Sequence, residues 1–282
     1  MKGRNLILLT GITSFVGSSL LINKKFIEKY DIIGTDSKNY YKLDNHSLRE
    51  IEISDFYKVA KAYKEITIIH LATFFSLSDK DKYRIIDSNV NYGKSLINKL
   101  FIEKIKIRKI IYTNSLFCFS DDDTLKNSHY TKSKIKFSNF LDEFCLENDI
   151  FFSEFFIDNT IGPNDKRKKI IPLIINSIID EKENPLQNPD KFINMIDVSE
   201  FIKIIYQSID NNTSEKHAVY SKFNYNLESV YNYLSSKINN KKTSVIQTAK
   251  NDYQKTLPKD VNKIEIDYNI EKTLDSIIKY LN

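Results

Sequence analysis

Tryptophan is absent from this chain of 282 residues, and cysteine, proline and glycine are scarce, with 2, 5 and 6 copies. So little glycine and proline excludes collagen-like and low-complexity sequence. Cys118 and Cys145 are too few for a disulfide framework and too far apart for a metal-binding pair, so we expect buried thiols in a reducing compartment. The 41% of hydrophobic residues is enough for a sizeable core.

Long hydrophobic runs are also missing from the N-terminal region. The first apolar run covers residues 6–9 and ends at Thr10-Gly11, which is too short for a membrane span or a signal peptide. We therefore expect a cytoplasmic protein with no membrane partner.

Arginine occurs only five times, and the net charge of +5 comes from lysines that are interleaved with acidic residues. Nucleic-acid-binding proteins usually gather basic residues on one face, whereas the densest basic run here is residues 166–169. We expect no nucleic-acid partner. We also expect no metal site, because the three consecutive carboxylates of residues 121–123 cannot all point at one ion.

Short runs rich in Ile and Val alternate with amphipathic segments over the first 160 residues. This alternation is typical of parallel strands joined by crossover helices. We expect strands at residues 5–10, 31–35, 49–53, 66–71, 109–114 and 151–157, and helices at residues 15–29, 56–64, 82–104 and 130–147. The sequence thus predicts an α/β fold, with a Rossmann-type, doubly wound parallel sheet in residues 1–160. Residues 161–282 are expected to form a smaller mixed α/β substrate-binding lobe, interleaved with late elements of the first domain.

A glycine-containing turn follows the first expected strand and leads directly into a helix. Gly11 permits a tight turn there, and Gly17 permits close contact between helix and strand. Asp36 ends the second strand, where a carboxylate accepts hydrogen bonds from the hydroxyls of an adenosine ribose. Ser14 stands where a middle glycine is usual, so its Cβ must be accommodated near a pyrophosphate, to which its hydroxyl can donate. The pattern indicates a dinucleotide-binding turn.

Tyr130 and Lys134 are four residues apart at the start of an expected helix, so they share one helical face. A lysine ammonium beside a phenol lowers the pKa of the phenol, which can then exchange a proton with a carbonyl or hydroxyl near neutral pH. Ser115, at the end of the fifth strand, is placed to hydrogen-bond the same oxygen. These three residues are the candidate catalytic group.

Together these motifs, with Asn89, His70-Leu71-Ala72 and Asn159-x-x-Gly162-Pro163, resemble the extended short-chain dehydrogenase/reductases, the NAD-dependent epimerase/dehydratase superfamily that acts on nucleotide sugars. The resemblance implies a catalytic triad of Ser115, Tyr130 and Lys134, with Asn89 supporting the lysine through a water. It implies that the cofactor is bound by Gly11, Ser14, Phe15, Val16, Gly17, Asp36, Glu52, Ile53, Leu71, Ala72, Thr73, Tyr130 and Lys134. Asp36 favours NAD, while Lys38 leaves NADP possible.

Within this superfamily the chain is most similar to sugar 4-ketoreductases of the CDP-abequose synthase type, which share its short gap between Ser115 and Tyr130. The substrate-binding residues are then expected to be Thr73, Ser115, Asn159, Lys169 and Asp197. A 4,6-dehydratase is disfavoured because Leu116-Phe117 replaces the acidic pair that follows the catalytic serine in those enzymes. The resemblance also has departures: the family's Arg-Asp-Phe motif is Asp190-Lys191-Phe192 here, and the later arginine that clamps the nucleotide phosphates is replaced near Asn251-Asp252.

The resulting expectation is an NAD(P)-dependent reductase of a nucleotide-activated 4-keto-deoxysugar, in the biosynthesis of surface-polysaccharide sugars. Two alternatives remain open, an NDP-sugar 4-epimerase with tightly bound NAD and a non-catalytic dinucleotide-binding protein. The resemblance also implies a homodimer formed by the helices at residues 82–104 and 130–147, with Leu96, Leu100, Ile135 and Leu141 as contact candidates. A monomer that packs these residues against its own sheet is the alternative.

Overall fold

The computed structural model describes residues 5–36, 39–44, 47–242, 244–250 and 257–281. The chain forms two compact units, each built from several segments. Unit 1 comprises Met1–Phe156, Ile202–Ala218 and Pro258–Asn262, and unit 2 comprises Ile157–Phe201, Val219–Leu257 and Lys263–Asn282.

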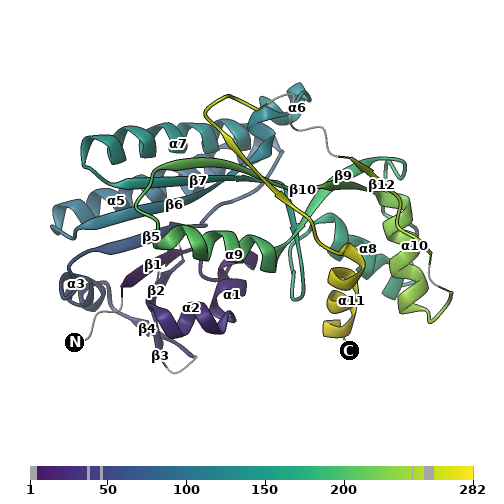
Figure 1. The fold of residues 1–282 in the computed structure, drawn as a ribbon, viewed down its shortest axis with the longest axis horizontal. Coiled ribbons are helices and arrows are strands. Elements are labelled where there is room, and N and C mark those ends of the chain that lie inside the picture. Colours follow the sequence, from purple (N-terminus) through teal and green to yellow (C-terminus); the bar gives the residue numbers. More distant parts are fainter. Residues whose placement is uncertain (1–4, 37–38, 45–46, 243, 251–256, 282) are drawn as a thin grey trace. The chain divides into compact units, whose positions relative to one another are not determined.

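Unit 1 is built around a nine-stranded sheet, in which the strands follow the order β13-β10-β7-β6-β5-β1-β2-β3-β4 (Figure 1). The strands are β1 (Leu6–Thr10), β2 (Asp31–Thr35), β3 (Tyr40–Asp44), β4 (Ser47–Ile51), β5 (Ile66–His70), β6 (Ile107–Ser115), β7 (Phe151–Ile157), β10 (Glu215–Ser221) and β13 (Asn262–Ile266). Strand β1 pairs in parallel with both β2 and β5, and β5 pairs in parallel with β6. The carboxyl ends of β1, β5 and β6 therefore meet at one edge of the sheet, where ligands bind in folds of this type.

One edge of this sheet differs from the sequence prediction. The parallel strand expected at residues 49–53 is instead β4, the outer strand of an antiparallel pair with β3, and β3 pairs antiparallel with β2. The short distance between β3 and β4 along the chain explains the orientation, because a parallel pairing requires a long crossover connection.

Helices cover both faces of the sheet, with α5 (Tyr92–Ile102) and α7 (His129–Glu147) on one face and α1 (Phe15–Leu21) and α2 (Lys24–Lys29) on the other (Figure 1). The single helix expected at residues 15–29 is broken because Asn23 caps α2 by accepting from the backbone N–H of Phe26. The helix expected at residues 82–104 contains a π-helical turn, Asp87–Asn91, between α4 (Lys82–Ile86) and α5. The remaining helical elements of this part are α3 (Ile53–Lys61), η1 (Asp79–Asp81), η3 (Leu116–Phe119) and α6 (Asp123–Lys126).

The core of unit 1 lies between the sheet and its helices, and it contains three of the four residues considered for a dimer interface. Leu96, Leu100 and Leu141 are at most 4% exposed and pack against strand residues such as Ile110. Only Ile135, at 38% exposure, remains on the surface. Packing within the chain thus accounts for the three leucines, as in the alternative given above.

Unit 2 is built on a four-stranded mixed sheet in the order β12-β11-β9-β8. Its strands are β8 (Asn159–Ile161), β9 (Phe192–Asp197), β11 (Phe223–Asn226) and β12 (Thr248–Lys250), and its helices are α8 (Ile170–Ile179), α10 (Leu227–Ile238) and α11 (Ile270–Leu281). Helix α9 (Val198–Ile209) leads from unit 2 into unit 1. Ile174, Met195, Val230, Leu234 and Leu274 are completely buried and centre a second apolar core.

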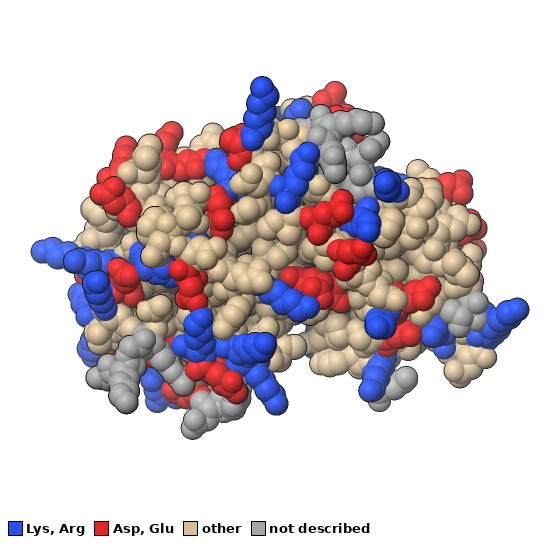
Figure 2. Space-filling view, in the orientation of Figure 1, with Lys and Arg blue, Asp and Glu red and all other residues tan. Residues whose placement is uncertain are grey.

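The expected α/β fold is confirmed, with a large, mostly parallel sheet and a second, smaller mixed sheet. Lys, Arg, Asp and Glu are interspersed over the face seen in Figure 2, without a basic stripe. No helix in the described part of the chain is long and apolar enough to cross a membrane.

Candidate functional site

The turn after β1 is closed so tightly that only glycine fits at two of its positions. Gly11 has φ of +69°, and a Cβ on it would lie 2.8 Å from the backbone nitrogen of Ala72. A Cβ on Gly17 would lie 2.3 Å from the carbonyl oxygen of Gly11. Strand β1, helix α1 and the end of β5 therefore approach one another at backbone distance, as a dinucleotide-binding turn requires.

Ser14, which in the sequence stands where a middle glycine is usual, is the N-cap of α1. Its Oγ accepts from the backbone N–H of Gly17 at 3.1 Å. A hydroxyl that accepts this bond still has its own hydrogen to donate, so the cap and the expected bond to a phosphate are compatible. Of the two residues that follow, Phe15 is buried at 7% exposure and Val16 is partly buried.

Asp36 follows β2, and its carboxylate is oriented by its own turn. One oxygen accepts from the backbone N–H of Asn39 at 2.9 Å and the other from the hydroxyl of Tyr41 at 3.0 Å. These two bonds fix the direction of the carboxylate at the end of β2. Lys38, the residue that keeps NADP open, lies outside the described residues.

The other residues expected at the cofactor lie at strand and helix ends in unit 1. Glu52 and Ile53 are exposed at the start of α3. Leu71 is buried directly after β5, Ala72 is partly buried and Thr73 is exposed. The backbone N–H of Ala72 donates to Thr10 Oγ1 at 3.2 Å, which ties the end of β5 to that of β1.

Ser115 ends β6 and caps the short η3 turn. Its Oγ accepts from the backbone N–H of Phe117 at 3.2 Å, and its residue exposure is 7%. Behind it, Oδ1 of Asn114 accepts the backbone N–H of Ser115 at 2.8 Å. The serine is therefore held on both sides at the carboxyl end of the sheet.

Tyr130 lies on the first turn of α7 in an aromatic setting. The ring centroid of Phe75 lies 4.9 Å from that of Tyr130 and that of Phe117 lies 6.3 Å away, both nearly edge-on. With the tyrosine only 9% exposed, these rings limit the access of water to it. Sequence reasoning missed Phe75, because a phenylalanine in a loop has no distinctive pattern.

Lys134 lies one helical turn after Tyr130 and reaches the end of β6. Its Nζ donates to the carbonyl of Thr113 at 2.6 Å and lies 4.4 Å from the ring centroid of Tyr112. Burial lowers the pKa of Lys134 to about 7, while the charges of Cys118 and Glu154 oppose that shift. The structure thus places the expected Ser115, Tyr130 and Lys134 on two adjoining elements, β6 and α7.

Asn89 lies in the π-helical turn between α4 and α5, where its amide holds the loop after β5 to α7. Its Oδ1 accepts from the backbone N–H of Phe74 at 2.6 Å and from Thr73 Oγ1 at 3.2 Å. Its Nδ2 donates to the carbonyl of Phe74 and to Ser133 Oγ, both within 3.1 Å. Asn89 therefore positions the loop that carries Thr73 and Phe75.

The remaining residues expected at the substrate lie in unit 2. Asn159 donates to Asp158 and to the carbonyl of Asn194. Lys169 precedes α8, and burial together with the charge of Arg167 lowers the pKa of Lys169 to about 8. Asp197 accepts from the backbone N–H of Ser199 at 2.7 Å and from Thr273 Oγ1 at 2.6 Å.

The segments where the resemblance implies phosphate-binding arginines are only partly described. Lys191 is exposed just before β9, whereas Asn251 and Asp252 lie outside the described residues. Arg167 is engaged by Asp165, with Nε 2.7 Å from Oδ1 and NH2 2.8 Å from Oδ2.

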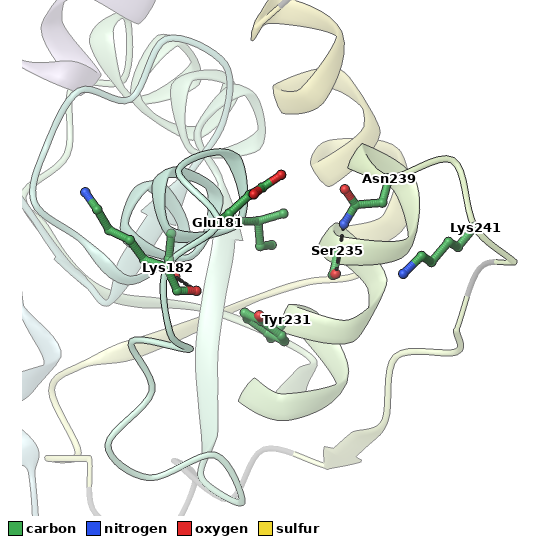
Figure 3. Close-up of a pocket in the computed structure, with 8 residues that line it drawn as sticks. Glu181, Lys182, Tyr231, Ser235, Asn239 and Lys241 are labelled. Atoms are coloured by element: carbon green, nitrogen blue, oxygen red, sulfur yellow. Dashed lines mark hydrogen bonds between the residues drawn. The ribbon is translucent and has the colours of Figure 1, made fainter.

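A pocket in unit 2 lies near the C-terminal ends of α8 and α10 (Figure 3). It is lined by Ser177, Ile178, Glu181, Lys182, Tyr231, Ser235, Asn239 and Lys241. None of the residues expected to bind cofactor or substrate is among them. Among the described residues, no group of three or more His, Cys, Asp or Glu side chains is arranged to hold a metal ion.

Comparison with known proteins identifies the family of the chain. Residues 7–224 match the model of the NAD dependent epimerase/dehydratase family. A search of curated proteins found no significant match.

Solved structures of nucleotide-sugar enzymes share the fold over nearly the whole chain. UDP-glucose 4-epimerase from Thermotoga maritima, with UDP-glucose, has a TM-score of 0.73 at 16% identity and covers 98% of both chains. UDP-glucuronic acid 4-epimerase from Bacillus cereus, in complex with NAD, has a TM-score of 0.73 at 14% identity, over 98% of this chain and 96% of that one. The NDP-hexosamine 5,6-dehydratase TunA of tunicamycin biosynthesis has a TM-score of 0.74 at 14% identity, over 99% and 98%.

The family model covers well over half of the sequence, and the glycine turn and the Ser115, Tyr130 and Lys134 group lie within it. The chain therefore belongs to the NAD dependent epimerase/dehydratase family, enzymes of the extended short-chain dehydrogenase/reductase type that use a nicotinamide dinucleotide and act on nucleotide sugars.

Proposed function

We propose that this protein is an NAD(P)-dependent reductase of a nucleotide-activated 4-keto-deoxysugar, with NAD as the preferred cofactor. Gly11, Ser14 and Gly17 would hold the pyrophosphate, and Asp36 the adenosine ribose. Neither Gly11 nor Gly17 has room for a Cβ, because other backbone atoms lie too close. Such a tight turn supports the binding of a dinucleotide cofactor. When bound, the nicotinamide supplies the hydride that reduces the ketone carbon.

Three side chains would handle the ketone oxygen. Tyr130 donates its phenolic proton as negative charge develops on that oxygen, and Ser115 donates a hydrogen bond to it. Lys134, one turn along α7, stabilises the phenolate that Tyr130 becomes. The edge-on rings of Phe75 and Phe117 keep water away from this exchange.

The observation that carries the proposal is the η3 turn directly after Ser115. Leu116 is 1% exposed, and the ring of Phe117 faces Tyr130. Elimination of water from a sugar needs an acid and a base beside the reacting carbons, and these two positions supply neither. Carbonyl reduction by the Ser115, Tyr130 and Lys134 group needs no further titratable residue.

A 4-epimerase with tightly bound NAD is the second candidate, since it would use the same three residues reversibly. It is favoured by the epimerases among the structural neighbours. In either case we propose that unit 2 supplies substrate contacts through Asn159, Lys169 and Asp197. Thr73 would contribute from unit 1. A homodimer, a cytoplasmic location and a role in surface-polysaccharide biosynthesis remain part of the proposal.

The test is NADH oxidation with CDP- and dTDP-4-keto-6-deoxyhexoses, followed by absorbance at 340 nm. Tyr130→Phe is expected to lower turnover at least about a hundredfold, while NADH binding persists. Tyr280→Phe is the matched control, because this exposed tyrosine on α11 is 60% accessible. Purified protein that carries stoichiometric NAD and interconverts two 4-epimers, without net oxidation of NADH, would establish the epimerase instead. Full activity of Tyr130→Phe would rule out both.

A further inference from the structure

Glu154 is a charged residue buried inside the sheet of unit 1. It lies in the middle of β7 with 0% exposure, among the buried neighbours Phe152, Ser153 and Phe155. Isolated carboxylates are rarely buried completely, because loss of water strongly disfavours the charged form. The proposed reaction gives Glu154 no role, so its surroundings need an explanation.

The carboxylate of Glu154 is hydrogen-bonded to Asn114, the residue that precedes Ser115 on β6. Its Oε1 accepts from Nδ2 of Asn114 at 2.6 Å. Because an ionised carboxylate only accepts hydrogen bonds, the amide nitrogen of Asn114 must point toward Glu154, and the amide oxygen must point away from it. The other end, Oδ1, then accepts the backbone N–H of Ser115 at 2.8 Å and the thiol of Cys118 at 3.4 Å.

The second oxygen of Glu154 faces a cation. Oε2 lies 3.8 Å from Nζ of Lys216 and, within the described part of the chain, has no hydrogen-bond partner. Lys216 also pairs with Asp142 on α7, and both side chains are partly exposed. A line of polar groups thus runs from solvent through Lys216, Glu154 and Asn114 to the backbone of Ser115.

The same carboxylate acts on Lys134. Burial and the nearby charges have opposite effects on the pKa of this lysine, with Cys118 and Glu154 favouring the ammonium. Burial and the charge of Lys134 lower the pKa of His70 to about 3, so the imidazole is neutral. Tyr112 presents its ring, and burial raises the pKa of its hydroxyl. Of these groups Glu154 is the carboxyl group, and its ionised form favours the Lys134 ammonium.

Burial disfavours the ionised form of Glu154, and its neighbours favour it. Burial raises the pKa of Glu154, while the Ser138 hydroxyl, the hydrogen bond from Asn114 and the charge of Lys216 limit that rise and Asp142 adds to it. Removal of Lys216 would thus raise the pKa of Glu154 further.

We propose that Glu154 is a positioning residue for this site, whose buried carboxylate, paired with Lys216, orients Asn114 behind Ser115 and places a negative charge beside the β6 segment that Lys134 and Cys118 contact. The assignment rests on the proposed function for the roles of Ser115 and Lys134. The effect of the Glu154 charge can be measured without a substrate, because the same charge acts on Cys118. Burial is the main cause, and the Glu154 charge a smaller one, of the rise in the pKa of the Cys118 thiol to about 12.

The first test uses Cys118 as a reporter and needs no activity. Glu154→Gln keeps an oxygen acceptor for Asn114 and removes the charge. Alkylation by iodoacetamide at pH 8, resolved by peptide mass spectrometry, is expected to be about tenfold faster at Cys118 in this variant, which corresponds to about one pKa unit. Cys145 is the internal control, since the pKa of its thiol is raised by burial and Asp142 rather than by Glu154. An unchanged Cys118 rate would overturn the electrostatic assignment.

The second test is the pH profile of kcat/KM. In Glu154→Gln, Lys134 should lose its proton at a lower pH, because the negative charge of Glu154 is gone. The fall of kcat/KM on the alkaline side of the profile should then occur about one pH unit lower. Activity near pH 6 should approach that of the unchanged protein. A purely structural role predicts a uniform loss at all pH values with an unshifted limb, and that result would contradict the proposal.

A second variant guards against misfolding of Glu154→Gln. Lys216→Met, at a partly exposed position, should shift both readouts in the same direction by a smaller amount. Lys182→Met, which breaks an exposed pair with Asp180, should shift neither. If no nucleotide sugar is turned over by the unchanged protein, the proposed function fails, while the Cys118 rates still decide the role of Glu154.

Discussion

The Lys134 ammonium donates a hydrogen bond to the backbone carbonyl of Thr113 at 2.6 Å, two residues before Ser115. This hydrogen bond joins helix α7, which carries the proposed proton donor Tyr130, to strand β6, which ends in Ser115. The bond also satisfies a cation that is only 3% exposed. The position of this lysine is thus set by the fold, but its burial has a cost in stability.

Lys134→Met should therefore stabilise the protein while abolishing activity. Burial lowers the pKa of Lys134 from its ordinary 10.5 to about 7, so between these values the unfolded chain binds more protons and stability rises with pH. The cost of the buried charge is complete below pH 7 and disappears toward pH 10.5. We expect the variant to gain about 1–4 kcal/mol at pH 6 and much less at pH 9.5, as measured by urea unfolding. An equal gain at both pH values would contradict the assigned cause.

Ser14→Ala should lower the free energy of unfolding by about 1 kcal/mol, because the N-cap of α1 is lost, whereas Ser14→Gly should cost only a few tenths. If the Ser14 hydroxyl also binds the pyrophosphate, Ser14→Ala will weaken NADH binding as well. Asn23→Ala is the matched control, since it removes the cap of the neighbouring helix α2. It should lower stability similarly and leave the Kd for NADH unchanged in a fluorescence titration.

Gly17→Ala should lower stability and cofactor affinity together. The added methyl group would lie 2.3 Å from the carbonyl oxygen of Gly11, which is backbone and cannot rotate away. Helix α1 must then move from the turn, at a cost of about 1–3 kcal/mol. Thermal unfolding and NADH titration of the same sample measure both effects, and a variant with unchanged values would show that the turn is looser than described.

Asp36→Ser should reduce the preference for NADH over NADPH. The carboxylate is held by Asn39 and Tyr41, and its charge repels the 2′-phosphate of NADPH. We expect NADH affinity to fall about tenfold, or about 1.4 kcal/mol, with NADPH affinity maintained or improved. Asp44→Ser, at an aspartate on β3 that pairs with Lys42, should change neither. An unaltered ratio of the two affinities would count against ribose recognition by Asp36.

Patterns confined to one turn or one helix can be predicted from the amino-acid sequence alone. The spacing of Gly11 and Gly17 and that of Tyr130 and Lys134 reflect local geometry, because each pair lies within a few residues. The expected helices are less accurate where a side chain interrupts them. Asn23 ends the first and caps the second, and this cap residue is the signal that could have revealed the break.

Contacts between distant segments cannot be predicted in this way. The antiparallel arrangement of β3 and β4 depends on which strand pairs with β2, and the burial of Leu96 and Leu141 depends on the packing of helices on the sheet. The sequence around Glu154 in β7 does not indicate that this residue will contact Asn114, which lies 40 positions earlier in the chain.

The amino-acid sequence by itself determined the alternation of strands and helices, the glycine turn and the Ser115, Tyr130 and Lys134 group, since these follow from spacing along the chain. Only the tertiary structure decided which groups surround that site. The pKa of Lys134 depends on how much water is excluded and on which charges come near, and both are set when β6, β7 and α7 pack together.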